Sequence, residues 1–284
     1  MARVRIITDA TAHLAPDLID RYQITVLPIE VQFGGERFVI GPGDSARRLF
    51  KKMVDGPVDP IEASISPQAL REAYSRLNRE TDEILVIPSS RMLSTAYNTA
   101  LAEASAFLGR CQIAVTDSMS TSWGLGLIIE AAARAAGEGK TLDQTVRLVR
   151  GILPHIYVIF FVERLDYLEW GKRIGSAQAR LGTMLCIKPL LMVEDGDIIP
   201  LEKVRTRGLA IEKLADFVAE FAAIQQVVIL RSPLEDDTDQ LRDKLEEQLS
   251  HLGPDPQFPV IDYDPVLACH LGPNALGVTV YEGL

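Results

Sequence analysis

The first half of the chain repeats one pattern: a short aliphatic run, a polar loop, and a segment in which apolar residues recur with helical spacing. The apolar runs predict strands at residues 4–7, 84–87 and 113–115, and residues 24–33 also have an extended pattern. Helices are predicted at residues 16–22, 45–53, 67–79, 96–108 and 122–136, and from Thr141, where Gln144 completes a capping box. This alternation predicts a parallel sheet with helices on both faces.

Polar residues follow three of these strands, in loops that begin at Thr8, Ser89 and Thr116. Because ligands of parallel α/β sheets bind at the carboxyl ends of the strands, we expect these loops to share one edge. A single Ser or Asp in such a loop is usually only the cap of the next helix.

The second half has a different pattern. It predicts strands at 157–162, 187–193, 198–204, 227–230 and 277–281, and helices at 165–170, 176–185, 208–223 and 237–252. A hairpin turn is predicted at Glu194–Asp197. The chain is therefore expected to be an α/β protein of two domains, a parallel-sheet α/β domain at residues 1–150 and an α+β domain at residues 151–284.

Composition narrows the classes of function. The chain has 284 residues, 47% hydrophobic, and a formal net charge of −10, so nucleic acid is not an expected partner. No apolar run approaches the roughly 18 residues of a membrane span. The start of the chain does not resemble a secretory signal, and the three cysteines lie far apart, so a cytoplasmic location is expected. The spacing of the cysteines and histidines predicts no metal site.

Common motifs for cofactors and hydrolysis are missing. Gly139-Lys140-Thr141 resembles the end of a phosphate-binding loop, but Arg134 stands where the first glycine is required. There is no Gly-x-Ser-x-Gly sequence of the kind found in α/β-hydrolases. No cofactor is therefore predicted.

A series of short motifs, in order along almost the whole chain, resembles the DegV family. They are Ile7-Thr8-Asp9-Ala10-Thr11-Ala12, Leu93-Ser94 with Tyr97, Asp117-Ser118, Leu165-Asp166-Tyr167-Leu168, Gly171-Lys172-Arg173-Ile174, Ile187-Lys188-Pro189-Leu190-Leu191, Lys203-Val204-Arg205 and His270-Leu271-Gly272-Pro273-Asn274-Ala275. Each motif is short, but the ordered set is hard to obtain by chance.

The resemblance implies a DegV-like two-domain protein that is not itself an enzyme. It would hold one long-chain fatty acid in an apolar tunnel, with the carboxylate at the domain junction. It would then present the acid to a separate ATP-dependent fatty acid kinase. By position, the residues matching the carboxylate site are Ser94, Ser64, Thr95, Arg173 and His270. Candidates for the tunnel are Phe160, Phe161, Ile187, Leu190 and Met192, and for partner docking Arg205 and Arg207.

Physical chemistry is consistent with these assignments. A buried carboxylate requires hydrogen-bond donors, which loop hydroxyls supply, and a nearby cation keeps it ionised. The acyl chain supplies the affinity, at about 0.8 kcal/mol per buried CH₂. Each tunnel candidate has an equally simple interpretation as a core residue.

The sequence departs from the family pattern at the expected site. Thr95-Ala96 replaces a Gly-Thr pair, and Ala63-Ser64-Ile65-Ser66 replaces Thr-Ser-Gln-Pro in what is expected to be a polar loop. If the glycine position required a positive φ, Thr95 would be strained. We therefore hypothesise a pocket altered in headgroup geometry or chain preference. Two alternatives are a stand-alone enzyme that uses Ser94, His270, Asp9 or Asp117, and a protein-interaction module with a vestigial cavity.

Overall fold

The computed structural model describes residues 4–44, 46–55, 62–163, 166–170, 188–234, 238–249 and 257–283. The chain forms two compact units. The first unit consists of Met1–Ala46 and Ile61–Pro154, and the second of Arg47–Pro60 and His155–Leu284. The segment Arg47–Pro60 thus belongs to the second unit although it interrupts the first in sequence.

The first unit is built on a four-stranded parallel sheet. Its order is β2 (Thr25–Leu27), β1 (Arg5–Asp9), β6 (Glu83–Val86) and β7 (Gln112–Val115). Ile7 of β1 is opposite Thr25 on one side and Val86 on the other. The central strands are apolar and buried on both faces, as is usual for parallel sheets. The predicted parallel sheet is confirmed.

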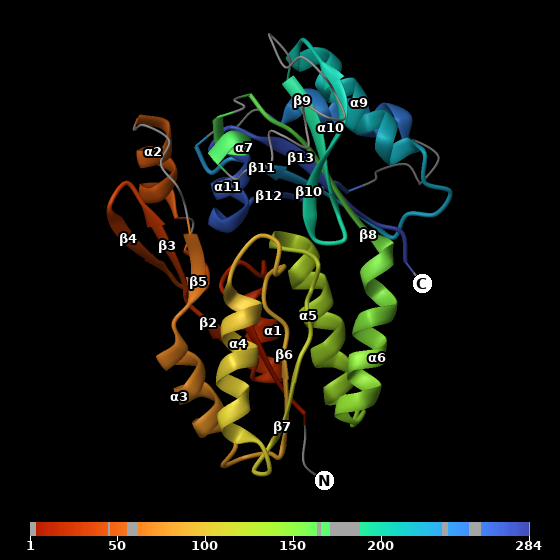
Figure 1. Cartoon of the computed structure of the whole chain (residues 1–284). Helices are drawn as coiled ribbons and strands as arrows, with labels where there is room; N and C mark the ends of the chain where they lie inside the picture. Colours follow the sequence, from red (N-terminus) through yellow and green to blue (C-terminus); the bar gives the residue numbers. More distant parts are fainter. Residues whose placement is uncertain are drawn as a thin grey trace. The chain divides into compact units, whose positions relative to one another are not determined.

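Helices cover both faces of this sheet. The helix α3 (Pro67–Leu77) packs against α4 (Ala96–Ala104), which contacts β7, and a short 3₁₀ turn (Ser105–Phe107) follows α4. Two longer helices, α5 (Ser122–Gly137) and α6 (Leu142–Ile152), pack together (Figure 1). Of these, α5 also contacts β1 and the short helix α1 (Pro16–Tyr22). The predicted capping box of Thr141 and Gln144 is present at the start of α6.

A three-stranded antiparallel sheet adjoins this part of the chain. Its order is β4 (Glu36–Ile40), β3 (Ile29–Phe33) and β5 (Glu62–Ile65). The expectation of a polar loop at Ala63–Ser66 is wrong, because residues up to Ile65 pair with β3 as a strand. Ala63 and Ile65 are buried while Ser64 between them is half-buried, which is the alternation of a strand with one covered face.

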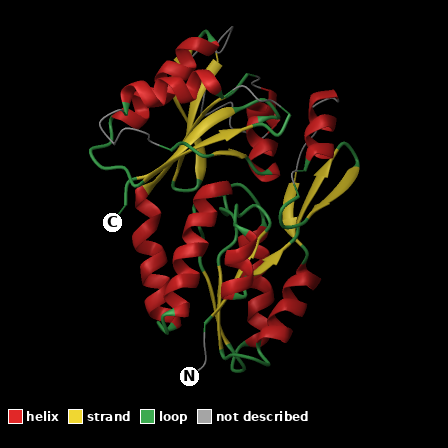
Figure 2. Ribbon diagram, turned by 180° about the vertical axis from the view of Figure 1, so that it is seen from behind, coloured by secondary structure: helices red, strands yellow, loops and turns green. Residues whose placement is uncertain are grey.

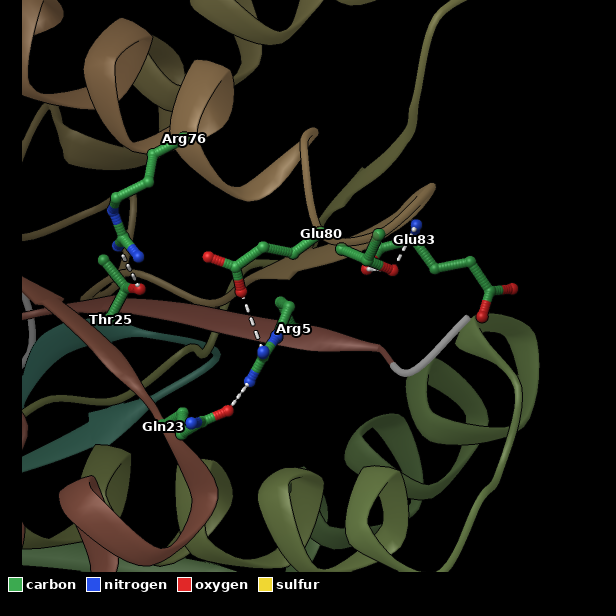
Figure 3. A network of polar contacts seen from close by, with 7 residues as sticks. Arg5, Gln23, Thr25, Arg76, Glu80 and Glu83 are labelled. Atoms are coloured by element: carbon green, nitrogen blue, oxygen red, sulfur yellow. Dashed lines mark hydrogen bonds and ion pairs between the residues drawn. The ribbon is translucent and has the colours of Figure 1, made fainter. Parts of the chain in front are cut away.

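Polar side chains tie the strands together where the parallel sheet begins. Arg5 donates hydrogen bonds to Gln23 and to Glu80, and Arg76 donates to the Thr25 hydroxyl (Figure 3). These contacts lie at the amino ends of the strands, away from the loops that follow β1, β6 and β7. They are therefore structural contacts, separate from the candidate site.

The second unit contains a six-stranded mixed sheet. Its order is β10 (Asp197–Val204), β9 (Lys188–Glu194), β8 (Ile156–Phe161), β13 (Leu276–Tyr281), β11 (Gln226–Arg231) and β12 (Val260–Asp262). All neighbours are antiparallel except β11 and β12. The predicted hairpin is confirmed, with Asp195 and Gly196 both at positive φ in the turn between β9 and β10.

Two helices, α9 (Arg207–Ala219) and α10 (Asp239–Gln248), cover one face of this sheet and share its apolar core. Figure 2 shows these helices on one side of the strands. A second group comprises α2 (Arg47–Asp55), α7 (Asp166–Trp170) and α11 (Pro265–Leu271), in which α11 contacts both α7 and α2. The helix α11 was not among the elements predicted from the sequence. The helix predicted at residues 176–185 lies outside the described residues.

Candidate functional site

The loops that follow three parallel strands meet at one edge of the sheet in the first unit. The Thr8 hydroxyl donates to the carbonyl oxygen of Ile87 at 2.8 Å. The Ser90 amide donates to the carbonyl oxygen of Ser120 at 2.9 Å. The Thr116 amide donates to that of Val86, also at 2.9 Å. The expectation that these loops share one edge is therefore confirmed.

Asp9 is the residue at this edge to which two of the loops are hydrogen-bonded. It lies at the end of β1, is 0% exposed, and accepts hydrogen bonds from two loops. Its Oδ1 accepts from the Thr11 amide at 2.9 Å and also from the Thr11 hydroxyl. Its Oδ2 accepts from the Ser89 amide at 2.7 Å. A buried carboxylate with these donors is satisfied, and it holds the Ser89 backbone in place.

Ser94 is hydrogen-bonded to the same loop. Its Oγ lies 2.9 Å from the Oγ of Ser89 and accepts a hydrogen bond from the Ala96 amide at 3.3 Å. Ser94 is 7% exposed, whereas Ser89 is fully buried. The Ser94 hydroxyl is thus at the margin of a buried polar cluster, just before the first turn of α4.

The loop at Ser94 is also joined to β5. The Thr95 amide and hydroxyl both donate to the carbonyl oxygen of Ala63, at 3.0 and 3.3 Å. Thr95 has a φ of −87°, so threonine in place of glycine is not strained there. Ser64 follows Ala63 and is opposite Glu30 of β3. Among the described residues, no hydrogen bond joins Ser64 to Ser94.

His270 belongs to the second unit, in the last turn of α11, and is half-buried. The loop after it is held by Tyr263, whose hydroxyl donates to the carbonyl oxygen of Gly272 at 2.8 Å and accepts from the Ala275 amide at 3.1 Å. Tyr167 packs against Gly272 so closely that a Cβ there would lie 2.6 Å from its ring. Tyr167 and Gly272 belong to two of the motifs that resemble the DegV family, and these two motifs therefore contact each other directly.

The two candidate docking arginines have different surroundings. Arg205 is exposed. Arg207 is half-buried, with Nη1 3.3 Å from Oε1 of Glu163 and its guanidinium 5.1 Å from the centre of the Phe161 ring. Lys188 pairs with the same Glu163, and burial together with the nearby Arg207 charge lowers the pKa of Lys188. Arg207 is therefore part of an internal ion-pair cluster.

The apolar candidates lie on opposite faces of the second sheet. Phe161 is opposite Leu190 and, with it, belongs to the core under α9 and α10. By strand alternation Met192 points to the same face, whereas Phe160 points to the other. These residues therefore cannot all line one cavity on one face. The remaining candidates, Arg173 and Ile187, lie outside the described residues.

Two potential nucleophiles, Cys269 and Ser94, have surroundings that bear on independent catalysis. Burial raises the pKa of the Cys269 thiol, so this cysteine is a poor nucleophile. Within the described segments, the side chain bonded to the Ser94 hydroxyl is another serine rather than a base. The described residues contain no group of three or more metal-ligating side chains, and none of their helices is long and apolar enough to cross a membrane.

These features define a class of protein: a two-unit α/β protein with a buried hydroxyl cluster at the carboxyl edge of a parallel sheet. The model of the DegV family, described only as a family of uncharacterised proteins, matches residues 3–283. A DegV domain-containing protein of Streptomyces coelicolor is 32% identical over 98% of both chains. The chain belongs to the DegV family.

Solved structures show the same fold. A DegV family protein of Thermus thermophilus, described as binding fatty acid, is 27% identical and superposes with a TM-score of 0.82 over 99% of this chain and 100% of that one. A fatty acid binding DegV family protein of Streptococcus agalactiae is 24% identical, with a TM-score of 0.86 over the full length of both chains. The two-unit α/β architecture is thus that of the family.

Proposed function

We propose that this protein binds a long-chain fatty acid and that the Ser94 hydroxyl donates a hydrogen bond to the ligand carboxylate. The observation that carries the proposal is the position of Ser94, which lies at the ligand-binding edge of a parallel sheet and keeps some exposure while its neighbour Ser89 has none. The Thermus thermophilus protein, described as binding fatty acid, supports the choice of ligand.

The first turn of α4 adds to this site. Its amides point toward the Ser94–Thr95 loop, and the first amides of a helix have no carbonyl partner within the helix. Such a helix terminus favours a negative charge. Thr95 keeps its side chain exposed beside Ser94 although its hydroxyl also reaches Ala63. Thr95 is a second candidate donor, whose hydroxyl would turn from the Ala63 carbonyl to the carboxylate when the acid binds. Ser64, one residue beyond Ala63, is a more distant candidate.

In the second unit, His270 and Arg173 remain the proposed cationic residues for the headgroup. For the acyl chain, Phe160 is the preferred candidate of the described set, because Phe161 and Leu190 already fill the core under α9 and α10. Phe160 is fully buried on the opposite face, beside Gly277, which has no side chain to cover its ring. A larger side chain at residue 160 should therefore alter chain preference.

The binding proposal is tested by native purification, extraction and mass spectrometry, followed by titration with a long-chain fatty acid. We expect a near-stoichiometric fatty acid in the extract and a loss of affinity of about tenfold or more for Ser94→Ala, since a hydrogen bond to a charged group is removed. Ser118→Ala is the matched control, because the Ser118 hydroxyl is buried at the same edge but bonds to Ser120. An empty extract, with no uptake of added acid, would contradict the proposal.

We further propose that the bound acid is presented to a separate ATP-dependent kinase, as the family resemblance implies. Arg205 is the residue to test, because its side chain is exposed while Arg207 is held by Glu163. Arg205→Glu should lower acyl-phosphate formation by an added fatty acid kinase and leave fatty acid affinity unchanged. Equal phosphorylation of the variant and the unaltered protein would argue against docking at Arg205.

A further inference from the structure

The direction of the hydrogen bond between Ser89 and Ser94 follows from their surroundings. The two Oγ atoms are 2.9 Å apart, and geometry alone allows either hydroxyl to donate. Ser89 is 0% exposed, and among the described residues its hydroxyl has no other hydrogen-bond partner than Ser94. If Ser94 donated, the Ser89 hydrogen would be buried without an acceptor, which is unfavourable. The Ser89 hydroxyl must therefore donate to Ser94.

This direction determines what Ser94 can do. A serine hydroxyl has one hydrogen to donate and two lone pairs that accept. Both lone pairs of Ser94 are used, one by the Ser89 hydroxyl and one by the Ala96 amide. Its own hydrogen is therefore left to point outward, and Ser94 retains 7% exposure through which a ligand oxygen can approach.

Ser89 is itself held from the other side. Its amide donates to Asp9 Oδ2 at 2.7 Å, and Asp9 is fixed by Thr11 through Oδ1. The chain of contacts runs from the buried carboxylate through the Ser89 backbone to the two hydroxyls. Of these groups, Asp9 and Ser89 do not need to touch the ligand.

We propose that Ser89, anchored by Asp9, is a positioning residue that orients the Ser94 hydroxyl as a donor toward an anionic ligand oxygen. The ligand part of this inference rests on the proposed fatty acid site. The orientation itself does not, because it follows from burial and hydrogen bonding within the first unit.

The hydrogen bond between the two serines, on which the orientation depends, is tested without ligand by urea unfolding of Ser89→Ala, Ser94→Ala and the double variant. In the unaltered protein Ser89→Ala removes a satisfied hydrogen bond, so the urea midpoint should fall. In the Ser94→Ala background the same change removes a buried hydroxyl that has lost its acceptor, so the midpoint should rise. Ser118→Ala should have the same effect in both backgrounds, because the Ser118 hydroxyl bonds to Ser120 and to neither of the two serines. A fall of equal size for Ser89→Ala in both backgrounds would overturn the proposal.

A second experiment measures binding affinity and compares a long-chain fatty acid with the primary alcohol of the same chain length. Ser89→Ala should weaken binding of the acid by about three- to tenfold, the effect of one misdirected hydrogen bond, and change binding of the alcohol little. In the Ser94→Ala background it should cause no further loss. Equal losses for acid and alcohol would indicate general loosening and overturn the positioning role. If the unaltered protein binds no acid, the proposed function fails, and the unfolding experiment still tests the hydrogen bond between Ser89 and Ser94.

Discussion

At the scale of single residues, Gly272 shows how closely the His270 loop is fitted. Its φ of 84° is in the region that favours glycine, and a Cβ there would lie 2.6 Å from the Tyr167 ring. Gly272→Ala should lower the free energy of unfolding by about 2–5 kcal/mol, from backbone strain and overpacking together. Chemical denaturation of the variant measures this change.

The matched control is Gly208→Ala, in the second position of α9. A Cβ at Gly208 meets nothing within 4 Å, and the residue is helical. Alanine is favoured over glycine in a helix, so this variant should be unchanged or more stable by up to about 1 kcal/mol. If both variants had the same stability, the contact between Tyr167 and Gly272 would not be as tight as the geometry indicates.

At the scale of elements, the sequence predicted those whose signals are local. The strands β1, β6 and β7 appear as aliphatic runs, and the capping box of α6 is complete in Thr141 and Gln144. The helix α11 was missed although its start carries a local signal. Asp264 accepts from the Val266 and Leu267 amides at 2.8 and 3.0 Å, and Pro265 occupies the first helical position. An Asp-Pro pair of this kind predicts a helix start.

The strand β5 was missed for a different reason. Its four residues, Glu62–Ile65, have too short a pattern to distinguish a strand from a polar loop, and their structure depends on pairing with β3. The consequence for the site is direct: Ser64 projects from a strand rather than a free loop.

Similarly, the residue types at Ser89 and Asp9 are evident in the sequence, but the contact between them joins residues 80 positions apart. Only the fold shows that Asp9 supports Ser94 through Ser89.

The apolar tunnel candidates point to opposite faces of the second sheet, and this too depends on strand pairing that the sequence alone does not show. Phe160 and Phe161 are adjacent in sequence, and composition alone suggests both for one cavity. Because successive strand residues point to opposite faces, only one of them can be on a given side of the second sheet. Pairing with Leu190 and the core of α9 and α10 assigns Phe161 to the filled side. The register of β8 and β9, rather than hydrophobicity, makes this distinction.

At the scale of the whole molecule, the net charge of −10 opposes the capture of an anion, so the free energy of the proposed fatty acid binding should come mainly from the acyl chain. Each buried CH₂ contributes about 0.8 kcal/mol before ordering costs. Lengthening a fatty acid from about 12 to about 16 carbons should therefore tighten binding by up to about 200-fold. Titration at about 0.15 M salt, where the screening length is about 8 Å, limits the contribution of long-range repulsion.

The same series of fatty acids distinguishes the contribution of the headgroup to the affinity from that of the acyl chain. If Ser94 contacts only the carboxylate, Ser94→Ala should weaken every chain length by the same factor, because contributions from distant parts of a ligand add. The slope of log affinity against carbon number should then be unchanged, while Phe160→Trp should change the slope or shorten the preferred chain. A flat chain-length dependence in the unaltered protein would contradict an acyl cavity. A Ser94 effect that varied with length would place that residue beside the chain instead of the headgroup.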